Sequence, residues 1–60
     1  MSSRNGFAML YQYLAINDID IEANTNLELL EGVIAQLNDQ TLTPDSTLLE
    51  ILEIIESSEN

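Results

Sequence analysis

Carboxylates are the only abundant reactive side chains in this sequence. The 60 residues include eleven Asp and Glu and one basic residue, Arg4, but no cysteine and no histidine. Without Cys, His or Lys, the usual nucleophile–base pairs cannot be assembled. Two carboxylates in a cleft could act as general acid and base, but so short a chain rarely forms such a cleft. We therefore expect no catalytic residues and a protein that is not an enzyme.

One acidic segment begins with the spacing of a calcium-binding loop. Asp18, Asp20 and Glu22 stand at alternate positions, as in the first half of an EF-hand loop. The second half departs from that pattern, because Ala23 replaces the turn glycine and Leu29 replaces the bidentate glutamate. The chain also lacks the sulfur and imidazole ligands of zinc sites and any glycine-rich phosphate loop. We expect neither a metal nor a cofactor.

A serine stands near the start of the last acidic segment. The twelve residues from Asp45 to Glu56, DSTLLEILEIIE, resemble the segment of acyl carrier proteins in which a serine at the start of an acidic helix carries the phosphopantetheine arm. The resemblance would make Ser46 the attachment site. Thr47 stands where that family has leucine, and serine near a helix start is ordinary capping chemistry. A carrier function therefore ranks below two kinds of binding protein.

Glutamates also recur in rows with helical spacing. Each step of three residues rises about 4.5 Å along a helix, so such a row forms a ladder of negative charge. A solvated helix face explains the rows, and so does an acidic nucleic-acid mimic of the phage-inhibitor type that occupies a basic groove of a DNA- or RNA-handling protein. The candidate acidic interaction residues are Glu28, Glu31, Glu50, Glu53 and Glu56.

The net charge of −10 restricts the partners of the chain. It repels phosphates, so we expect no direct nucleic-acid partner and no membrane partner. It favours another protein with a basic surface, and it also keeps a chain with 45% hydrophobic residues soluble. No apolar run is long enough to span a bilayer and no signal-peptide pattern occurs, so we expect a cytoplasmic protein.

Three helices must position these side chains. Apolar spacing predicts helices at about 7–16, 26–38 and 44–57. Joined by short polar connections, they predict an all-α fold, a small three-helix bundle that forms one domain over residues 1–60. The connection 17–25 should be a loop that tucks its isoleucines under the helices, with a short strand as the alternative.

Local signals suggest where the helices begin. Asn5 is the expected cap of the first helix, and Thr25 and Glu28 form a T-x-x-E capping box for the second. Thr43 followed by Pro44 predicts the start of the third, with proline in its first turn. Within the second helix, glycine at position 32 permits either a close helix approach or a plain surface position.

The third helix has more apolar surface than one neighbour can cover. Its aliphatic residues spread over roughly 220° of the helical wheel, against the roughly 100° that an ordinary surface helix buries. The edge residues Leu49 and Ile54 should therefore need a second cover. Because the chain has no disulfide to brace a small core, we expect a homodimer that acts by protein–protein binding as a regulator, adaptor or inhibitor. The candidate apolar interaction residues are Phe7, Tyr11, Tyr13, Leu49 and Ile54.

Overall fold

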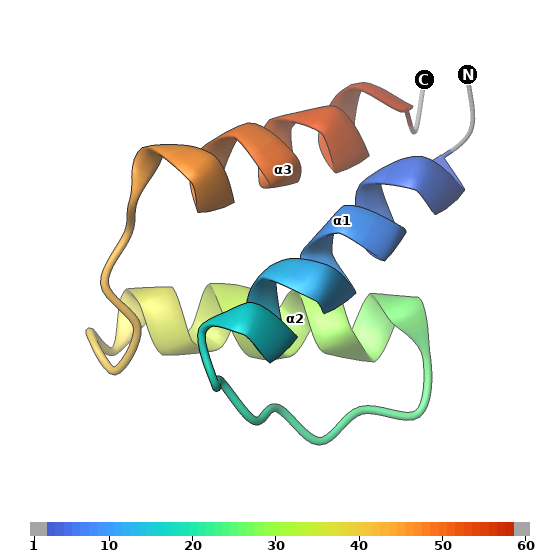
Figure 1. Cartoon of the computed structure of the whole chain (residues 1–60). Helices are drawn as coiled ribbons and strands as arrows, with labels where there is room; N and C mark the ends of the chain where they lie inside the picture. The colour runs from blue at the N-terminus through green and yellow to red at the C-terminus, as the bar shows by residue number, and fades with distance from the viewer. Residues whose placement is uncertain (1–2, 59–60) are drawn as a thin grey trace.

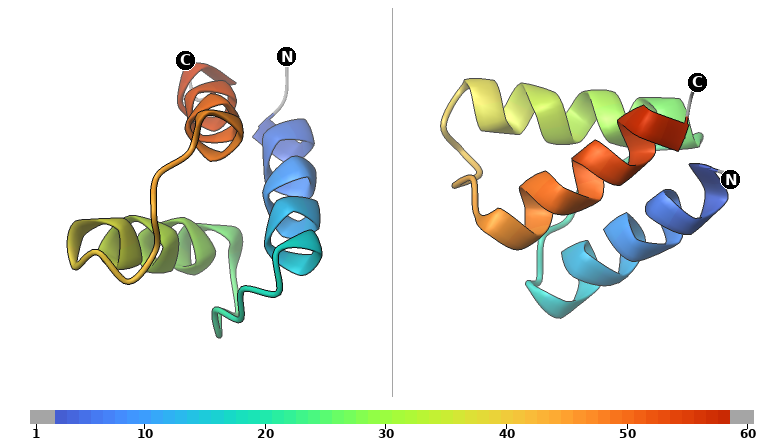
Figure 2. Two further views of the ribbon diagram at one scale, coloured as in Figure 1. Left: turned by 60° about the vertical axis from the view of Figure 1, so that its left-hand side comes forward. Right: turned by 90° about the horizontal axis from the view of Figure 1, so that it is seen from above.

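Three helices make up the described part of the chain. The computed structural model describes residues 3–58, with side chains from residue 5 onward. It places α1 at Ser3–Ile16, α2 at Asn26–Asn38 and α3 at Ser46–Ser58. α1 and α3 run side by side in roughly opposite directions (Figures 1 and 2). In the view of Figure 1, α2 lies below α3 and behind the C-terminal half of α1. No strand occurs within residues 3–58, which confirms the predicted all-α class and the loop at 17–25.

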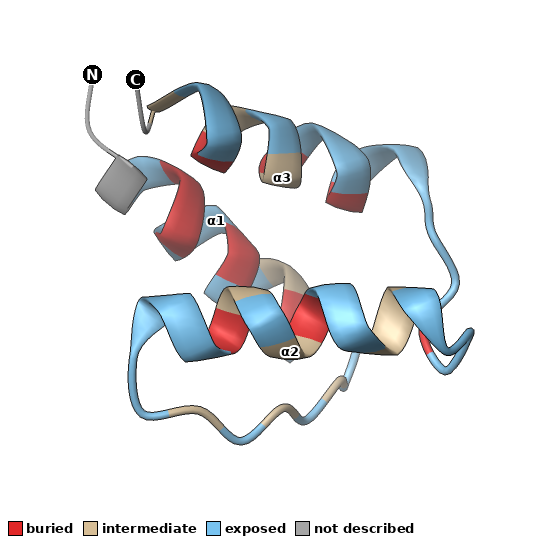
Figure 3. Ribbon diagram, turned by 180° about the vertical axis from the view of Figure 1, so that it is seen from behind, coloured by how far each residue is buried: buried red, intermediate tan, exposed pale blue. Residues whose placement is uncertain are grey.

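The core lies where the three helices face one another (Figure 3). Each helix contributes its inward stripe, and the loop before α3 adds one leucine. No described residue of the core is polar or charged, so burial of apolar surface is the main stabilising force there. The buried apolar set is Phe7, Leu10, Leu14, Leu29, Val33, Leu42, Leu48, Ile51 and Ile55.

Gly6 allows the start of α1 to approach the end of α3. A Cβ atom at Gly6 would lie 2.6 Å from Ile55 Cγ1 and 3.3 Å from Ile54 Cγ2, and the first of these distances is too short for real carbon atoms. The two helix ends lie side by side in each view of the ribbon (Figures 1 and 2). The absence of a side chain at Gly6 therefore sets how closely these helices pack.

The capping box at the start of α2 is present. The backbone N–H of Glu28 donates to Thr25 Oγ1 at 3.1 Å. In return, Glu28 Oε1 accepts from the backbone N–H of Asn24 at 2.9 Å, one residue before the cap rather than at the cap itself. Both predicted bounds of this helix, at 26 and 38, are confirmed.

The predicted starts of the other two helices are wrong. α1 begins at Ser3, so Asn5 lies inside the helix and is not its cap. The next residue, Gly6, packs against α3, and this contact stabilises the additional turn at the start of α1. α3 begins at Ser46, beyond Thr43 and Pro44. Asp45 caps it instead, because its Oδ1 accepts from the backbone N–H of Leu48 at 2.9 Å.

Left-handed residues that are not glycine end both α1 and α2. Asp18 follows α1 with φ of 59°, and Gln40 follows α2 with φ of 66°. After α1 the N–H of Ile19 donates to Leu14 O at 2.9 Å and that of Asp18 donates to Ala15 O at 3.2 Å. These are the two bonds of a Schellman motif, which satisfies carbonyls that the helix end leaves free.

The loop from 17 to 25 packs on the helices through its apolar side chains. Ile19 and Ile21 are half-buried against the core, as predicted. Gly32 of α2 makes room for one of them, since a Cβ atom there would lie 2.7 Å from Ile21 Cγ2. Gly32 thus admits a loop side chain, which is neither the close helix approach nor the plain surface position that the sequence left open.

Candidate binding surfaces

A groove of about 350 Å³ lies between α2 and α3. Among the residues that the structure describes, Leu30 and Ile34 of α2 and Leu52 and Ile55 of α3 line it, and Glu56 is the one charged lining residue. Ile55 belongs to the core and Leu30 and Leu52 are partly buried against it, whereas Ile34 is exposed. The groove therefore combines an apolar interior with one carboxylate at its edge.

Exposed leucines extend the apolar surface beside this groove. On α2, Leu27, Leu30 and Ile34 follow the i, i+3, i+7 spacing of one helix face. Leu27 is 63% exposed and Ile34 is 45% exposed. On α3, Leu49 is 49% exposed and precedes Leu52 by one turn. Leu27 and Ile34 were absent from the predicted interaction residues, because periodicity places them on the apolar face without showing how much of that face a neighbour covers.

The five predicted acidic residues are all exposed. Glu56 lines the groove, and Glu31 borders the apolar stripe of α2 at helical spacing from Leu27 and Ile34. In the row Glu50–Glu53–Glu56, each step of three residues rotates by about 60° around the helix. The row therefore winds around α3 and reaches the groove only at its last member.

The predicted apolar residues separate into three groups. Phe7 is buried in the core, so its side chain packs within the chain. Tyr13 and Ile54 are half-buried, while Tyr11 and Leu49 are exposed. The expectation that Leu49 or Ile54 stays substantially exposed is confirmed at Leu49 alone. Ile54 is partly covered where α1 approaches α3.

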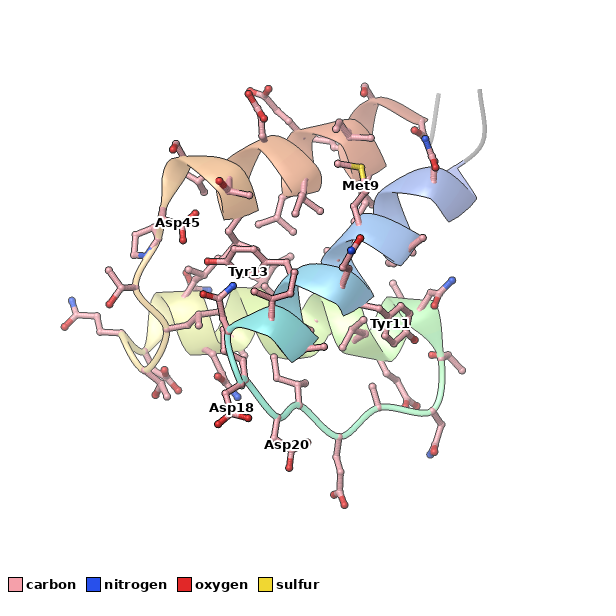
Figure 4. All side chains as sticks on the ribbon, viewed as in Figure 1. Met9, Tyr11, Tyr13, Asp18, Asp20 and Asp45 are labelled. Carbon is pink, nitrogen blue, oxygen red and sulfur yellow. The ribbon has the colours of Figure 1, made fainter. Side chains whose placement is uncertain are left out.

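Both tyrosine hydroxyls donate to residues at helix starts. Tyr13 Oη donates to Asp45 Oδ2, and Tyr11 Oη donates to Asn26 Oδ1 at 3.1 Å (Figure 4). The bond to Asp45 raises the pKa of Tyr13, with burial and the negative charge of Asp45 adding to the effect. The same bond, with help from the N–H groups of Leu48 and Thr47, lowers the pKa of Asp45. The tyrosines therefore orient α1 relative to both other helices.

A second groove, of about 210 Å³, lies between α1 and α3. No carboxylate is among its described lining residues, which distinguishes it from the first groove. Met9 and Ile16 border it and are themselves exposed. Neither residue is among the apolar interaction residues predicted from the sequence. The lining residues are Met9, Gln12, Tyr13, Ile16, Thr47 and Ile51.

The described residues contain neither a metal-binding cluster nor a membrane-spanning helix. Within residues 3–58 no group of three carboxylates is close enough to hold a metal ion, and Asp18 and Asp20 point outward from the loop (Figure 4). None of the helices in the described region has the length and apolar character needed to cross a membrane. Comparison of the chain with protein-family models, curated proteins and solved structures gives no match.

Proposed function

We propose that this chain is a non-catalytic binding protein whose α2–α3 groove holds an amphipathic helix of a basic partner protein. The composition of the groove carries the proposal, because its lining is apolar except for Glu56. A helix with an apolar stripe flanked by Lys or Arg matches both features. The stripe leaves water, and the cations approach carboxylates at the groove edge. Such binding suits a regulator, an adaptor or an inhibitor.

Self-association into a homodimer is the second part of the proposal. It is supported by the small core, the lack of any disulfide and the apolar side chains that stay exposed on α1, where Ile16 is 73% exposed. A second copy is a poor occupant of the α2–α3 groove, because each copy has eleven carboxylates and one arginine. The groove is therefore assigned to a basic partner, and self-association to another face.

An acidic mimic of nucleic acid is the alternative function. The exposure of Glu50, Glu53 and Glu56 supports it, since a mimic must present its charges to the basic groove of its target. Such a target would bind carboxylates and would be indifferent to the apolar lining between α2 and α3. The two functions therefore respond differently to a change in that lining.

Two synthetic peptides test the groove directly. One is an 18-residue amphipathic helix with leucines at i, i+3 and i+7 spacing and flanking lysines; the other has glutamates in place of the lysines. Isothermal titration should show binding of the lysine peptide alone, weakening as salt is added. Ile34→Lys, in the groove, should weaken binding about tenfold. Ile16→Lys, on α1, is the matched control and should leave it unchanged.

Each other outcome counts against the groove. Equal binding of the lysine peptide by the Ile34→Lys and Ile16→Lys proteins would rule out the α2–α3 groove as its binding site. Failure of the wild-type protein to bind the lysine peptide would rule it out as well. Salt-sensitive binding that ignores Ile34→Lys but is lost when Glu50, Glu53 and Glu56 are changed to glutamine would favour the acidic mimic instead.

A further inference from the structure

α1 is the one helix of the described chain that contains no carboxylate. Residues 3–16 include neither Asp nor Glu, whereas ten of the eleven carboxylates lie between Asp18 and Glu56. Two copies with a net charge of −10 each repel one another most where their carboxylates come close. The outer face of α1 is therefore the surface on which two copies can meet with the least repulsion.

That outer face has the spacing of a helix-pairing seam. Asn5, Met9, Gln12 and Ile16 are separated by four, three and four residues, which is the a/d spacing of a heptad repeat. All four side chains are exposed, and Ile16 is the most exposed large apolar residue described. An isolated surface isoleucine needs no explanation, but two apolar residues in register on an uncharged helix face indicate a partner helix.

We propose that α1 pairs in antiparallel fashion with α1 of a second copy, across a twofold axis at Gln12. The proposal rests on the self-association proposed above and names its interface. In a twofold contact residue i meets j and j meets i, so with the axis at Gln12 the side chain of Ile16 packs between Ala8 of the partner subunit and Met9 of the partner subunit, and the reverse. The two Gln12 amides meet at the axis, where each offers both a donor and an acceptor to the other.

The second groove completes this interface. It adjoins the seam between α1 and α3, and its lining includes Met9, Gln12 and Ile16 together with Thr47 and Ile51 of α3. The neighbouring carboxylates are Asp45, which is bound to the Tyr13 hydroxyl, and Glu50 on the exposed side of α3. An apolar side chain from the second copy therefore finds an uncharged recess beside the helix that it contacts.

The size and charge of the face determine how the dimer should behave. α1 is about 21 Å long, so a single helix pair buries less surface than a standard protein interface. We expect a concentration-dependent dimer. Added salt should strengthen it by screening the repulsion between copies, which is opposite to its expected effect on a basic peptide in the α2–α3 groove.

Disulfide cross-linking can locate the twofold axis, because the natural chain has no cysteine. Gln12→Cys places one thiol at the proposed axis, where the two copies bring their Cα atoms within disulfide reach. Ala35→Cys places one on the exposed surface of α2 as a matched control. Under mild oxidation Gln12→Cys should give about tenfold more covalent dimer than the control. Non-reducing electrophoresis measures the yield.

Sedimentation equilibrium then separates the interface from the oligomeric state. Ile16→Glu should shift the dimer towards monomer, while Ile34→Glu should leave it intact; circular dichroism checks that both variants fold. A wild-type dimer that persists in Ile16→Glu, or equal cross-linking of the two cysteine variants, would overturn the α1 interface alone. A wild-type protein that stays monomeric at all concentrations would overturn the proposed self-association as well. The proposed binding of a basic partner in the α2–α3 groove would be unaffected by that result.

Discussion

The phenolic hydroxyl of Tyr13 on α1 donates a hydrogen bond to the carboxylate of Asp45, the residue that caps α3. One carboxylate thus serves two elements, since Oδ2 accepts from the tyrosine and Oδ1 accepts from the backbone N–H of Leu48. Because α1 and α3 are joined only through α2 along the chain, this bond links elements that are distant in sequence and fixes how α1 lies against the start of α3.

Tyr13→Phe should make stability less dependent on pH. The lowered pKa of Asp45 stabilises the fold above its usual value of 3.8, and this contribution is lost as pH falls through the folded pKa. The raised pKa of Tyr13 contributes below 10.0 and is lost as pH rises through the folded value. Urea unfolding should therefore show Tyr13→Phe less stable than wild type at neutral pH, with the gap narrowing in acid. A constant gap across that range would contradict the link.

Gly6→Ala should destabilise the protein more than Gly32→Ala. Alanine gains about 1 kcal/mol of helix propensity at either site, so the packing decides the difference. At Gly6 the new methyl meets the buried side chain of Ile55, where overpacking typically costs about 1–3 kcal/mol. At Gly32 it meets half-buried Ile21, which lies on a loop and can shift. The midpoints of thermal unfolding compare the stability of the two variants. A lower midpoint for Gly32→Ala than for Gly6→Ala would refute this account of Gly6.

Truncation of Leu48 and truncation of its neighbour Leu49 should lower the free energy of unfolding by very different amounts. Leu48 is fully enclosed and Leu49 is half exposed. Leu48→Ala should lower the free energy of unfolding by about 2–5 kcal/mol, the range for a leucine removed from a packed core. Leu49→Ala removes far less buried surface and should cost under about 1 kcal/mol. Chemical denaturation with matched slopes measures both. Similar losses would mean that Leu49 is covered, as it would be if a partner chain bound there.

Threonines 25 and 43 provide a test of the observed caps. Thr25→Ala removes the side-chain oxygen that accepts from Glu28 N–H, and loss of such a cap typically costs about 1 kcal/mol. Thr43→Ala should change the free energy of unfolding little, because α3 begins at Ser46 behind the Asp45 cap. Equal losses in urea unfolding would place the start of α3 back at Thr43.

The features of the fold that could be predicted from the sequence are those with a local signal. The helix class, the middle helix with its capping box, and the exposure of Leu49 follow from periodicity and from residues four or fewer positions apart. The start of α3 was missed because Asp45 and Pro44 are both good helix-start residues, and the choice between them involves Tyr13, which is remote in sequence. The start of α1 was missed for a similar reason, since Gly6 packs against a helix some fifty residues later.

The candidate binding surfaces could be predicted from the sequence less well than the helices. Periodicity places Phe7 and Ile34 alike on apolar faces, yet Phe7 is in the core and Ile34 borders a groove. Which apolar face meets which neighbour depends on how three helices cross, and no local pattern encodes that. The exposure of the five glutamates could be predicted more easily, because a charged side chain with no buried partner remains in water.

The confinement of the carboxylates to residues after α1 also gives the molecule an orientation. A body whose carboxylates all lie outside one helix, which instead contains the only arginine of the sequence, experiences a torque in an external electric field. If the chain binds a basic partner as proposed, this charge distribution would favour approaches in which α2 and α3 face the partner and α1 faces the solvent. Encounters that begin in random orientations would thus be sorted towards the groove during approach, so the uneven placement of charge acts on the rate of association as well as on its strength.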